Sequence, residues 1–525
     1  MRNQKINKKV IICIITAISL LIISLAIGIF LSKPESTEKK FKKAIYVYMC
    51  ASTLEYNSGM ATANIEEMLK ADISENAVVV IETGGTKKWR GYDIPANKIC
   101  RYVVEDGTLV LKEMLENANM GRSSTLVNFL NYCNNNYPAE QTGLIFWNHG
   151  SGSINGVCFD QNYEMDSLTL TEIETSLFET NTHLNMVGFD ACLMATYDMA
   201  NMLSEYSDYM LASEEIEPGE GWDYTAFLQS LTDNNDMKRI GEAICDSYLE
   251  KCRNNETSGI ATLSLADLSK MNTVRETFGD FVDNLKKQSE EKDGNFETLT
   301  AINASVKFGG NSKIEGYSNL IDLYNFADEL KYLNSTALKM INAIDDMIIY
   351  KVNGESRMGA GGISLYYPSV YDNKQIKSYL TICQSKEYGN YLNFLYTNLP
   401  SETISFEDKG SIAEDGSFQI KLTTDSKKYI KSIEFYLIEF AKSENEENFP
   451  KINGLGIDND IYNDYDSMTF HSNFRGIWLA LDGKTLSYSV VESNSERIIF
   501  SAPVIVNNQI TNLRFSFIWD DSYEN

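Results

Sequence analysis

Residues 185–192 read NMVGFDAC, and residues 143–150 read GLIFWNHG. Each is a short apolar run that ends in small or polar residues, a pattern that predicts a buried strand. Further strands are predicted at 44–50 (AIYVYMC), 77–82 (AVVVIE), 208–215 (DYMLASEE), 259–265 (GIATLSL) and 361–368 (GGISLYYP). Helical spacing predicts helices at 61–71, 123–135, 167–178 and 193–203, and most of 236–350 is helical in pattern. This alternation predicts an α/β fold with a mostly parallel sheet flanked by helices.

The composition changes after Pro400. Residues 400–525 alternate with period two between turns such as EDG, LDG and NNQ. That pattern is typical of antiparallel sheets with one buried face. The sequence therefore predicts a separate C-terminal all-β domain, sandwich-like in form.

Residues 10–31 contain no charged residue and, at about 1.5 Å per residue, span about 33 Å, enough to cross a bilayer. Two interpretations compete, an uncleaved signal anchor and a cleaved signal peptide. The run exceeds the usual apolar region of a signal peptide, about 7–15 residues, and no A-x-A site follows it, which favours the anchor. The predicted parts are a cytoplasmic tail (1–9), a transmembrane helix (10–31), a linker (32–43), an α/β domain (44–399) and the β domain (400–525). The anchor places the rest of the chain outside the cytoplasm, and cleavage would make it a secreted protein.

The charge and the reactive residues exclude several functions. The chain has 46 basic and 73 acidic residues, a net charge of −27, which argues against nucleic acid as a partner and favours cationic substrates. Only three histidines occur, His149, His183 and His471, so an HExxH zinc site and a His-rich metal cluster are excluded. The nine cysteines show no disulfide spacing, and Cys245 and Cys252, seven apart in a predicted helix, are interpreted as small buried hydrophobes.

Two of the predicted strands deliver a reactive side chain at their carboxyl ends. The first leads to His149 and Gly150, and the second leads to Asp190 and Cys192. A thiol nucleophile needs a base or an imidazolium nearby, and a glycine lets the backbone N–H approach a developing oxyanion. Because the carboxyl ends of parallel strands share one edge, the two segments can form a single site there.

These segments resemble the clostripain family of cysteine peptidases, which belongs to the caspase-like clan. The resemblance covers roughly residues 44–400 and rests on six segments in order: 147–152 (WNHGSG), 156–160 (GVCFD), 168–172 (LTLTE), 188–194 (GFDACLM), 212–215 (ASEE) and 217–224 (EPGEGWDY). It implies a caspase-like sheet and a cysteine endopeptidase that acts on proteins or peptides and needs no cofactor for its chemistry.

The resemblance also implies roles for single residues. Cys192 would be the nucleophile and His149 the acid–base partner, with the backbone N–H groups of Gly150 and Cys192 as the oxyanion hole. Asp190 would line an acidic pocket for an Arg or Lys side chain of the substrate; the alternative is an aspartate that caps the following helix. If its strand persists, Asp190 also shares a face with Cys192. Weaker candidates for a second pocket acid are Glu214, Glu215 and Glu220.

Two family properties need separate treatment in this sequence. Members often mature by cutting after a basic residue between the two catalytic strands, yet residues 150–215 contain no Lys or Arg. Activity therefore needs no cut there, or the cut lies elsewhere, for example at 39–43 or at Lys238–Arg239. Relatives can also depend on calcium, and the acid-rich stretch Asp458-Asn459-Asp460, with Asp464 and Asp466, offers oxygen ligands for it. The alternative is a solvated acidic loop.

Two other functions compete with a peptidase. A catalytically silent surface protein would bind partners through the β domain, but both reactive residues are present in complete motifs. A serine hydrolase using Ser151 or Ser153 lacks the G-x-S-x-G elbow. His183, in a polar loop before the nucleophile strand, is a weak rival for the base, and His471 belongs to the β domain. The sequence favours a membrane-anchored or exported cysteine endopeptidase that cuts after Arg or Lys.

Overall fold

The computed structural model describes residues 41–290, 294–312, 316–368, 373–397, 404–412, 414, 417–430, 433–440, 452–458, 461–474, 480–481, 484–493, 497–506 and 509–518. The predicted tail (1–9), membrane span (10–31) and most of the linker lie outside these residues. Within the described ranges, no helix has the length and apolar character needed to cross a bilayer.

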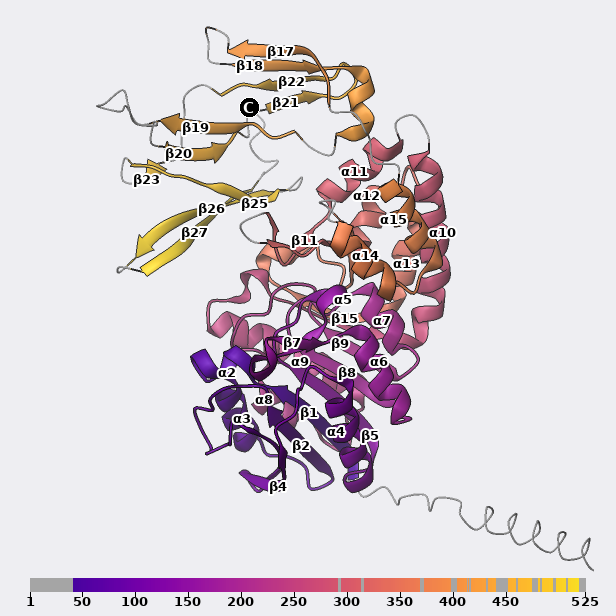
Figure 1. Cartoon of the computed structure of the whole chain (residues 1–525), viewed down its shortest axis with the longest axis vertical. Helices are drawn as coiled ribbons and strands as arrows, with labels where there is room; N and C mark the ends of the chain where they lie inside the picture. Colours follow the sequence, from indigo (N-terminus) through magenta and orange to yellow (C-terminus); the bar gives the residue numbers. More distant parts are fainter. Residues whose placement is uncertain are drawn as a thin grey trace, which may run out of the picture.

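A nine-stranded mixed sheet forms the centre of the α/β domain (Figure 1). Its order is β15-β10-β9-β8-β5-β1-β2-β3-β4. The strands are β1 (Phe41–Cys50), β2 (Ala77–Gly84), β3 (Lys98–Glu105), β4 (Thr108–Glu116), β5 (Ala139–Trp147), β8 (Leu184–Asp190), β9 (Ser207–Ala212), β10 (Thr262–Asp267) and β15 (Ile348–Asn353).

The prediction of a mostly parallel sheet holds only for the centre. The five strands from β9 to β2 are parallel, but β10 and β15 at one edge and β3 and β4 at the other are antiparallel. At the second edge the cause is local. Asp106 and Gly107 both have positive φ and form a two-residue turn, which joins β3 and β4 as a hairpin.

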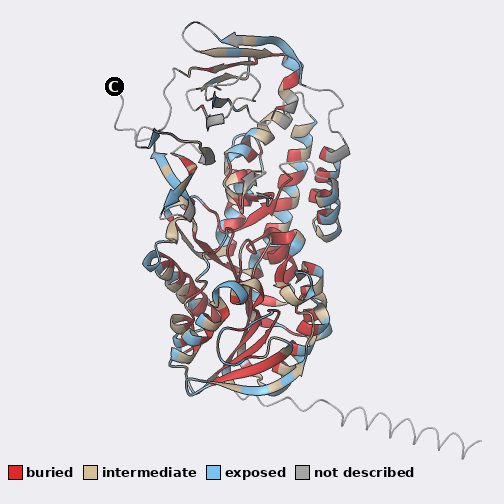
Figure 2. Cartoon of the chain, turned by 60° about the vertical axis from the view of Figure 1, so that its left-hand side comes forward, coloured by how far each residue is buried: buried red, intermediate tan, exposed pale blue. Residues whose placement is uncertain are grey.

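Helices cover both faces of the sheet, as predicted. Side chains on β1 alternate between two cores: Tyr46 and Tyr48 join one, while Val47 and Met49 join the other. The first core is covered by α4 (Ser123–Asn136), α6 (Leu170–Glu179) and α7 (Tyr197–Leu203), and the second by α3 (Met60–Lys70), α8 (Tyr224–Gln229) and α9 (Met237–Asn254). Buried residues, red in Figure 2, line the sheet and the helix faces that pack against it. Cys245 and Cys252 are both buried on α9 as free thiols, as interpreted.

A helical layer extends the first core away from the sheet. Its members are α10 (Met271–Ser289), α11 (Gly294–Ala304), α12 (Leu323–Glu329), α13 (Ala337–Met347), α14 (Asn373–Ile382) and α15 (Lys386–Thr397). Small strands lie beside it: β11 (Lys307–Phe308), β12 (Asn311–Ser312), β13 (Gly316–Tyr317), β14 (Leu320–Asp322) and β16 (Ser364–Tyr366). The strand predicted at 361–368 is thus shortened to β16 and pairs with β14 in a three-stranded sheet, not in the main one. The edge strand of the main sheet is instead β15, which begins within residues 236–350, the region that the sequence pattern predicted to be mostly helical.

Three strands end earlier than predicted at the carboxyl edge of the sheet, and one predicted helix begins later there. β5 stops at Trp147, β8 at Asp190 and β9 at Ala212. The helix predicted at 193–203 begins at Tyr197, where the side chain of Thr196 caps it. The residues released from regular structure form the loops that carry the reactive side chains. Short elements α2 (Ser52–Ser58), α5 (Gly152–Asn155), β6 (Val157–Asp160) and β7 (Asp166–Leu168) surround these loops.

Beyond residue 403 the regular elements in the described ranges are strands, apart from one 3₁₀ turn at Thr424–Tyr429, in agreement with an all-β domain. They are β17 (Phe406–Ile412), β18 (Phe418–Leu422), β19 (Tyr436–Phe440), β20 (Ile452–Ile457), β21 (Ile461–Asp464), β22 (Thr469–Ser472), β23 (Ala480–Leu481), β24 (Lys484–Thr485), β25 (Ser489–Ser493), β26 (Arg497–Val506) and β27 (Gln509–Ile518). The described strands form four small sheets, of four, two, two and three strands. In Figure 1 the sheet of β17, β18, β21 and β22 lies beyond α11, where Phe296 packs on Tyr465, and β25, β26 and β27 lie lower, to one side of α11.

Candidate active site

The two predicted catalytic segments leave the same edge of the sheet. β5 and β8 are adjacent and parallel, and Trp147 pairs with Asp190 at their carboxyl ends. The N–H of Asn148 donates to the carbonyl of Asp190 at 3.3 Å, so the two chains stay in register for one more residue. His149 and Cys192 each follow within two residues of this last pair. The structure therefore brings together the two residues that the sequence nominated.

Gly150 lies directly against the backbone of Cys192. A Cβ added at Gly150 would be 2.1 Å from the carbonyl oxygen of Cys192, so only glycine allows this approach. Neither the N–H of Gly150 nor the N–H of Cys192 donates a hydrogen bond to another residue in the described part of the chain. An oxyanion hole requires backbone N–H groups beside a thiol that are not bonded to other residues.

His149 is half-buried, and its ring is held from a third element. Nε2 lies 2.9 Å from Oγ1 of Thr53, which belongs to α2. Burial lowers the pKa of His149 below its usual range. The backbone is fixed as well, because the N–H of Cys158 donates to the carbonyl of His149 at 3.2 Å. No local sequence pattern points to Thr53, which lies 96 residues before His149.

Cys192 is half-buried in a constrained loop. The next residue, Leu193, has a φ of +65°, and its N–H donates to the carbonyl of Glu215 at 3.1 Å. Burial raises the pKa of the Cys192 thiol, and the negative charges of Glu215 and Asp190 raise it further. Together with the lowered pKa of His149, this makes an uncharged thiol–imidazole pair the resting form at neutral pH.

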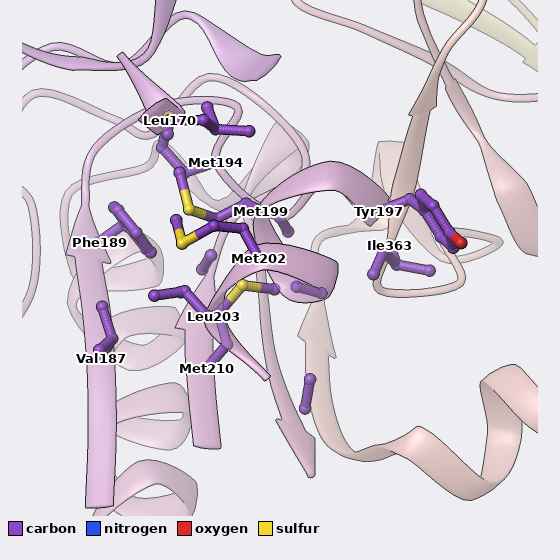
Figure 3. Packing of buried hydrophobic residues seen from close by; sticks show 14 of the residues in the cluster. Leu170, Val187, Phe189, Met194, Tyr197, Met199, Met202, Leu203, Met210 and Ile363 are labelled. Carbon is purple, nitrogen blue, oxygen red and sulfur yellow. The ribbon is translucent and has the colours of Figure 1, made fainter. Parts of the chain in front are cut away.

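A cluster of methionines packs behind this loop. Met194 of the loop packs with Met199 and Met202 of α7, and Phe189 faces them from β8 (Figure 3). All of these side chains are buried. The loop that carries Cys192 thus rests on a filled core, which restricts its movement toward the sheet.

Asp190 is buried, and its carboxylate faces the loop that precedes α8. It accepts a hydrogen bond from the hydroxyl of Tyr224 at 3.0 Å and from the N–H of Trp222 at 3.3 Å. Burial raises its pKa to about 6. Asp190 does not cap the following helix, because Thr196 does so. Since β8 ends at Asp190, the argument that Asp190 and Cys192 share a strand face does not apply.

Glu217 is a site residue that the sequence reasoning missed. Its side chain is buried and its carboxyl contacts that of Asp190. Neither of its oxygens accepts a hydrogen bond from an N–H or O–H group in the described structure. Burial, then the charge of Asp190, raises the pKa of Glu217 well above its usual range. The carbonyl of Glu217 lies 4.0 Å from Sγ of Cys192, so the residue that supplies the second acid borders the thiol.

The three weaker acid candidates have other surroundings. Glu215 is buried in an ion pair with Arg357, whose Nη2 and Nε lie 2.7 and 2.9 Å from Oε2. Glu214 accepts the N–H of Gly362 at 2.8 Å, and the nearby charge of Asp322 adds to the burial that raises the pKa of Glu214. Glu220 is half-buried, and its carbonyl, not its carboxylate, accepts from Lys251.

The remaining candidates lie elsewhere. His183 precedes the first residue of β8, at the opposite edge of the sheet from Cys192, and contacts Asp208 at 3.0 Å. His471 lies on β22. The hydroxyl of Ser153 donates to the buried Asp198 at 2.7 Å, and Ser151 accepts from Asn155 at 3.1 Å.

The proposed calcium ligands do not form a described site. Asp458 accepts a hydrogen bond from Ser472, and Asp464 accepts from the backbone and side chain of Ser467. Asn459 and Asp460 lie outside the described residues. No group of three or more metal-binding side chains occurs within the described ranges.

Comparisons with known proteins agree with this geometry. The family model of the clostripain family matches residues 47–403. Clostripain of Hathewaya histolytica is 26% identical over 321 residues, which cover 50% of this chain and 60% of the relative. The chain thus matches less than two thirds of that relative's length.

Solved structures show the same fold at low identity. A secreted C11 cysteine protease from Bacteroides thetaiotaomicron, in complex with an irreversible peptide inhibitor, is 16% identical with a TM-score of 0.52. It aligns with 67% of this chain and 99% of its own. An inactive zymogen C11 protease from Parabacteroides distasonis gives a TM-score of 0.51 at 16% identity, with the same coverage. The chain therefore shares the fold of these two solved C11 cysteine proteases. The chain belongs to the clostripain family.

Proposed function

We propose that this protein is a cysteine endopeptidase whose α/β domain, residues 44–399, cleaves protein or peptide chains after Arg or Lys. The observation that carries the proposal is the meeting of His149 and Cys192 at one sheet edge, with Gly150 packed against the nucleophile's backbone. The family membership supports the reaction class.

The reaction would follow from the positions of these groups. His149 takes the proton of the Cys192 thiol as the sulfur attacks the carbonyl carbon of the substrate. The N–H groups of Gly150 and Cys192 stabilise the oxyanion. The protonated His149 then gives its proton to the leaving amine, and an acyl-enzyme remains. His149 next activates a water molecule, which releases the second product. None of these steps needs a cofactor. Whether calcium is required is tested in the experiment below, by measuring activity with and without it.

The acid pair Asp190–Glu217 supports selectivity for a basic side chain. Two buried carboxyl groups in contact repel each other when both are ionised, so one stays protonated until a cation arrives. A guanidinium or ammonium of the substrate would relieve this repulsion and gain charge-assisted hydrogen bonds. We therefore propose Glu217 as the second acid of the pocket, in place of the predicted candidates Glu214, Glu215 and Glu220.

The cellular setting belongs to the same proposal. The uncharged run 10–31 would anchor the chain in a membrane with the catalytic domain outside the cytoplasm, or would be cleaved to release it. Maturation would not require a cut between the catalytic strands, which lack basic residues from 150 to 215. Lys238 and Arg239 lie in the first turn of α9, where regular helix opposes cleavage.

The test uses the full chain in detergent and fluorogenic peptides with Arg, Lys, Asp or Leu before the scissile bond, with and without calcium. Cys192→Ala should lose all activity. Cys383→Ala is the matched control, because Cys383 is the other half-buried cysteine among the described residues. Cleavage after Asp or Leu alone would reject the acid pocket and keep the dyad. No cleavage under any condition would favour a silent protein that binds partners through its β domain.

A further inference from the structure

We infer that Thr53 is a positioning residue for His149, and that it leaves Nδ1 as the ring nitrogen that exchanges protons with Cys192 and the substrate. The inference rests on the proposed peptidase function and deepens it. It starts from one contact: Oγ1 of Thr53 lies 2.9 Å from Nε2 of His149. Each ring nitrogen serves one partner at a time, so a hydroxyl on Nε2 assigns the proton exchange to Nδ1.

Thr53 reaches the histidine from the end of a third parallel strand. β1 lies beside β5, and Met49 pairs with Trp147 in the last register position. β1 ends at Cys50, and α2 begins two residues later at Ser52. The carboxyl ends of β1, β5 and β8, neighbours in the sheet, therefore supply Thr53, His149 and Cys192 in turn (Figure 1).

The start of α2 is fixed by contacts to both neighbouring strand ends. The side-chain amide of Asn148 donates to the carbonyl of Cys50, and the N–H of Ala51 donates to the carbonyl of Gly84 at 2.9 Å. Ser52 is buried and has a φ of +48°, a left-handed conformation that a serine adopts only under constraint. A backbone held in this way delivers the next side chain, Thr53, to one place.

The other end of α2 is clamped by a single arginine. Nε and Nη2 of Arg90 donate to the carbonyls of Tyr56 and Asn57, at distances from 2.7 to 3.2 Å. The buried carboxylate of Glu55 in turn accepts from the N–H of Arg90 and from Thr62. A helix of seven residues would fray without such partners. The clamp indicates that the position of α2 matters beyond the helix itself.

A hydroxyl suits both protonation states of the histidine. The hydroxyl of Thr53 can accept from Nε2 or donate to it, and the inference takes the first case. In that tautomer of the neutral ring the proton lies on Nε2, and the lone pair on Nδ1 is free to take the thiol proton of Cys192. After that transfer the ring carries a proton on each nitrogen, and the bond to Thr53 persists. Nδ1 then returns its proton to the leaving amine. Thr53 itself neither gains nor loses a proton, so its part is to hold the tautomer and the ring plane.

The test compares Thr53→Val, which keeps the shape without the hydroxyl, with Thr53→Ser, which keeps the hydroxyl. Thr175→Val on α6 is the matched control, because its hydroxyl bonds to a carbonyl of its own helix. We expect Thr53→Val to lose about 10- to 100-fold in kcat with little change in KM, and Thr53→Ser to retain activity within about threefold of the native enzyme. Equal kcat in the native and Thr53→Val enzymes would overturn the inference.

A second readout does not depend on activity. The chain has only three histidines, so nitrogen-15 NMR of labelled His side chains, assigned with His183→Gln and His471→Gln variants, reports the tautomer of His149 directly. We expect the proton on Nε2 in the native protein and in Thr53→Ser, and a mixture of tautomers in Thr53→Val. A proton on Nδ1 in the native protein would overturn the inference even if the enzyme cleaves peptides. The expected tautomers in a protein without peptidase activity would support the contact and reject the proposed function alone.

Discussion

Replacing Gly150 with alanine should remove most of the activity while the chain still folds. The added Cβ would lie 2.1 Å from the carbonyl oxygen of Cys192 and 3.0 Å from Cγ of Met194. A carbon and an oxygen in contact are about 3.2 Å apart, so one segment must move by about 1 Å. The oxygen in question belongs to the nucleophile's own residue, so the movement reaches the reacting sulfur.

The surrounding contacts leave little room for this movement. The next residue, Leu193, is held in a left-handed conformation by its bond to Glu215, and Met194 packs on a filled core. A misplacement of about 1 Å in a catalytic group costs about 100-fold in rate, equivalent to about 2.7 kcal/mol of transition-state stabilisation. Overpacking of this kind also lowers the free energy of unfolding by about 1–3 kcal/mol, which a domain of this size tolerates.

The assay is kcat/KM on an Arg peptide beside thermal unfolding of the same samples. Gly359→Ala is the control, because no atom lies within 4 Å of a Cβ at that glycine. We expect the control to match the native enzyme and Gly150→Ala to lose about 100-fold in kcat/KM with a modest fall in Tm. Native kcat/KM in Gly150→Ala would refute the reasoning, since the two loops could then separate without consequence.

Three further predictions concern the charges of the site. Burial raises the pKa of Asp190 to about 6, so acidification from pH 7.5 to 5 protonates its carboxylate. Benzamidine, a cationic probe of the pocket, should therefore bind about tenfold more weakly at pH 5 than at pH 7.5. The Asp190→Asn variant should bind benzamidine weakly at both pH values. Arg357→Met leaves the buried carboxylate of Glu215 without its ion-pair partner and should lower the free energy of unfolding, measured by urea titration, by about 3–5 kcal/mol. The control Arg253→Met, at an exposed ion pair, should lower it by less than about 1 kcal/mol. Alkylation of Cys192 by iodoacetamide should still accelerate above pH 8.5, because burial raises the thiol pKa; a rate that levels off below pH 7 would contradict a neutral resting pair.

The centre of the fold was predictable because its signals are local. A buried parallel strand is a short apolar run, and residues 44–50, 77–82 and 185–192 contain such runs. The hairpin β3–β4 was missed although Asp106-Gly107 is a strong turn signal between alternating strands. β15 was hidden for a different reason: its residues, Ile348–Asn353, follow α13 without a break and prolong its apolar pattern.

The sequence predicted only those parts of the site whose position follows from where the strands end. His149 and Cys192 follow adjacent parallel strands, so topology alone brings them to one edge. The partners of these residues depend on long-range packing that no local pattern encodes. Glu214 and Glu215 are adjacent in sequence, yet one meets Gly362 and the other Arg357, which lies 142 residues away in the chain.

Burial and the choice of a hydroxyl partner act on the catalytic pair in the same direction. Burial raises the pKa of Cys192 and lowers that of His149, which disfavours a thiolate–imidazolium pair at rest. A carboxylate beside Nε2 would offset this by stabilising the protonated ring, but the neutral hydroxyl of Thr53 does so only weakly. Charge would then form only as the thiol attacks, at the moment when the N–H groups of Gly150 and Cys192 meet the oxyanion. Such a site keeps the Cys192 thiol protonated when no substrate is bound, and a protonated thiol resists oxidation.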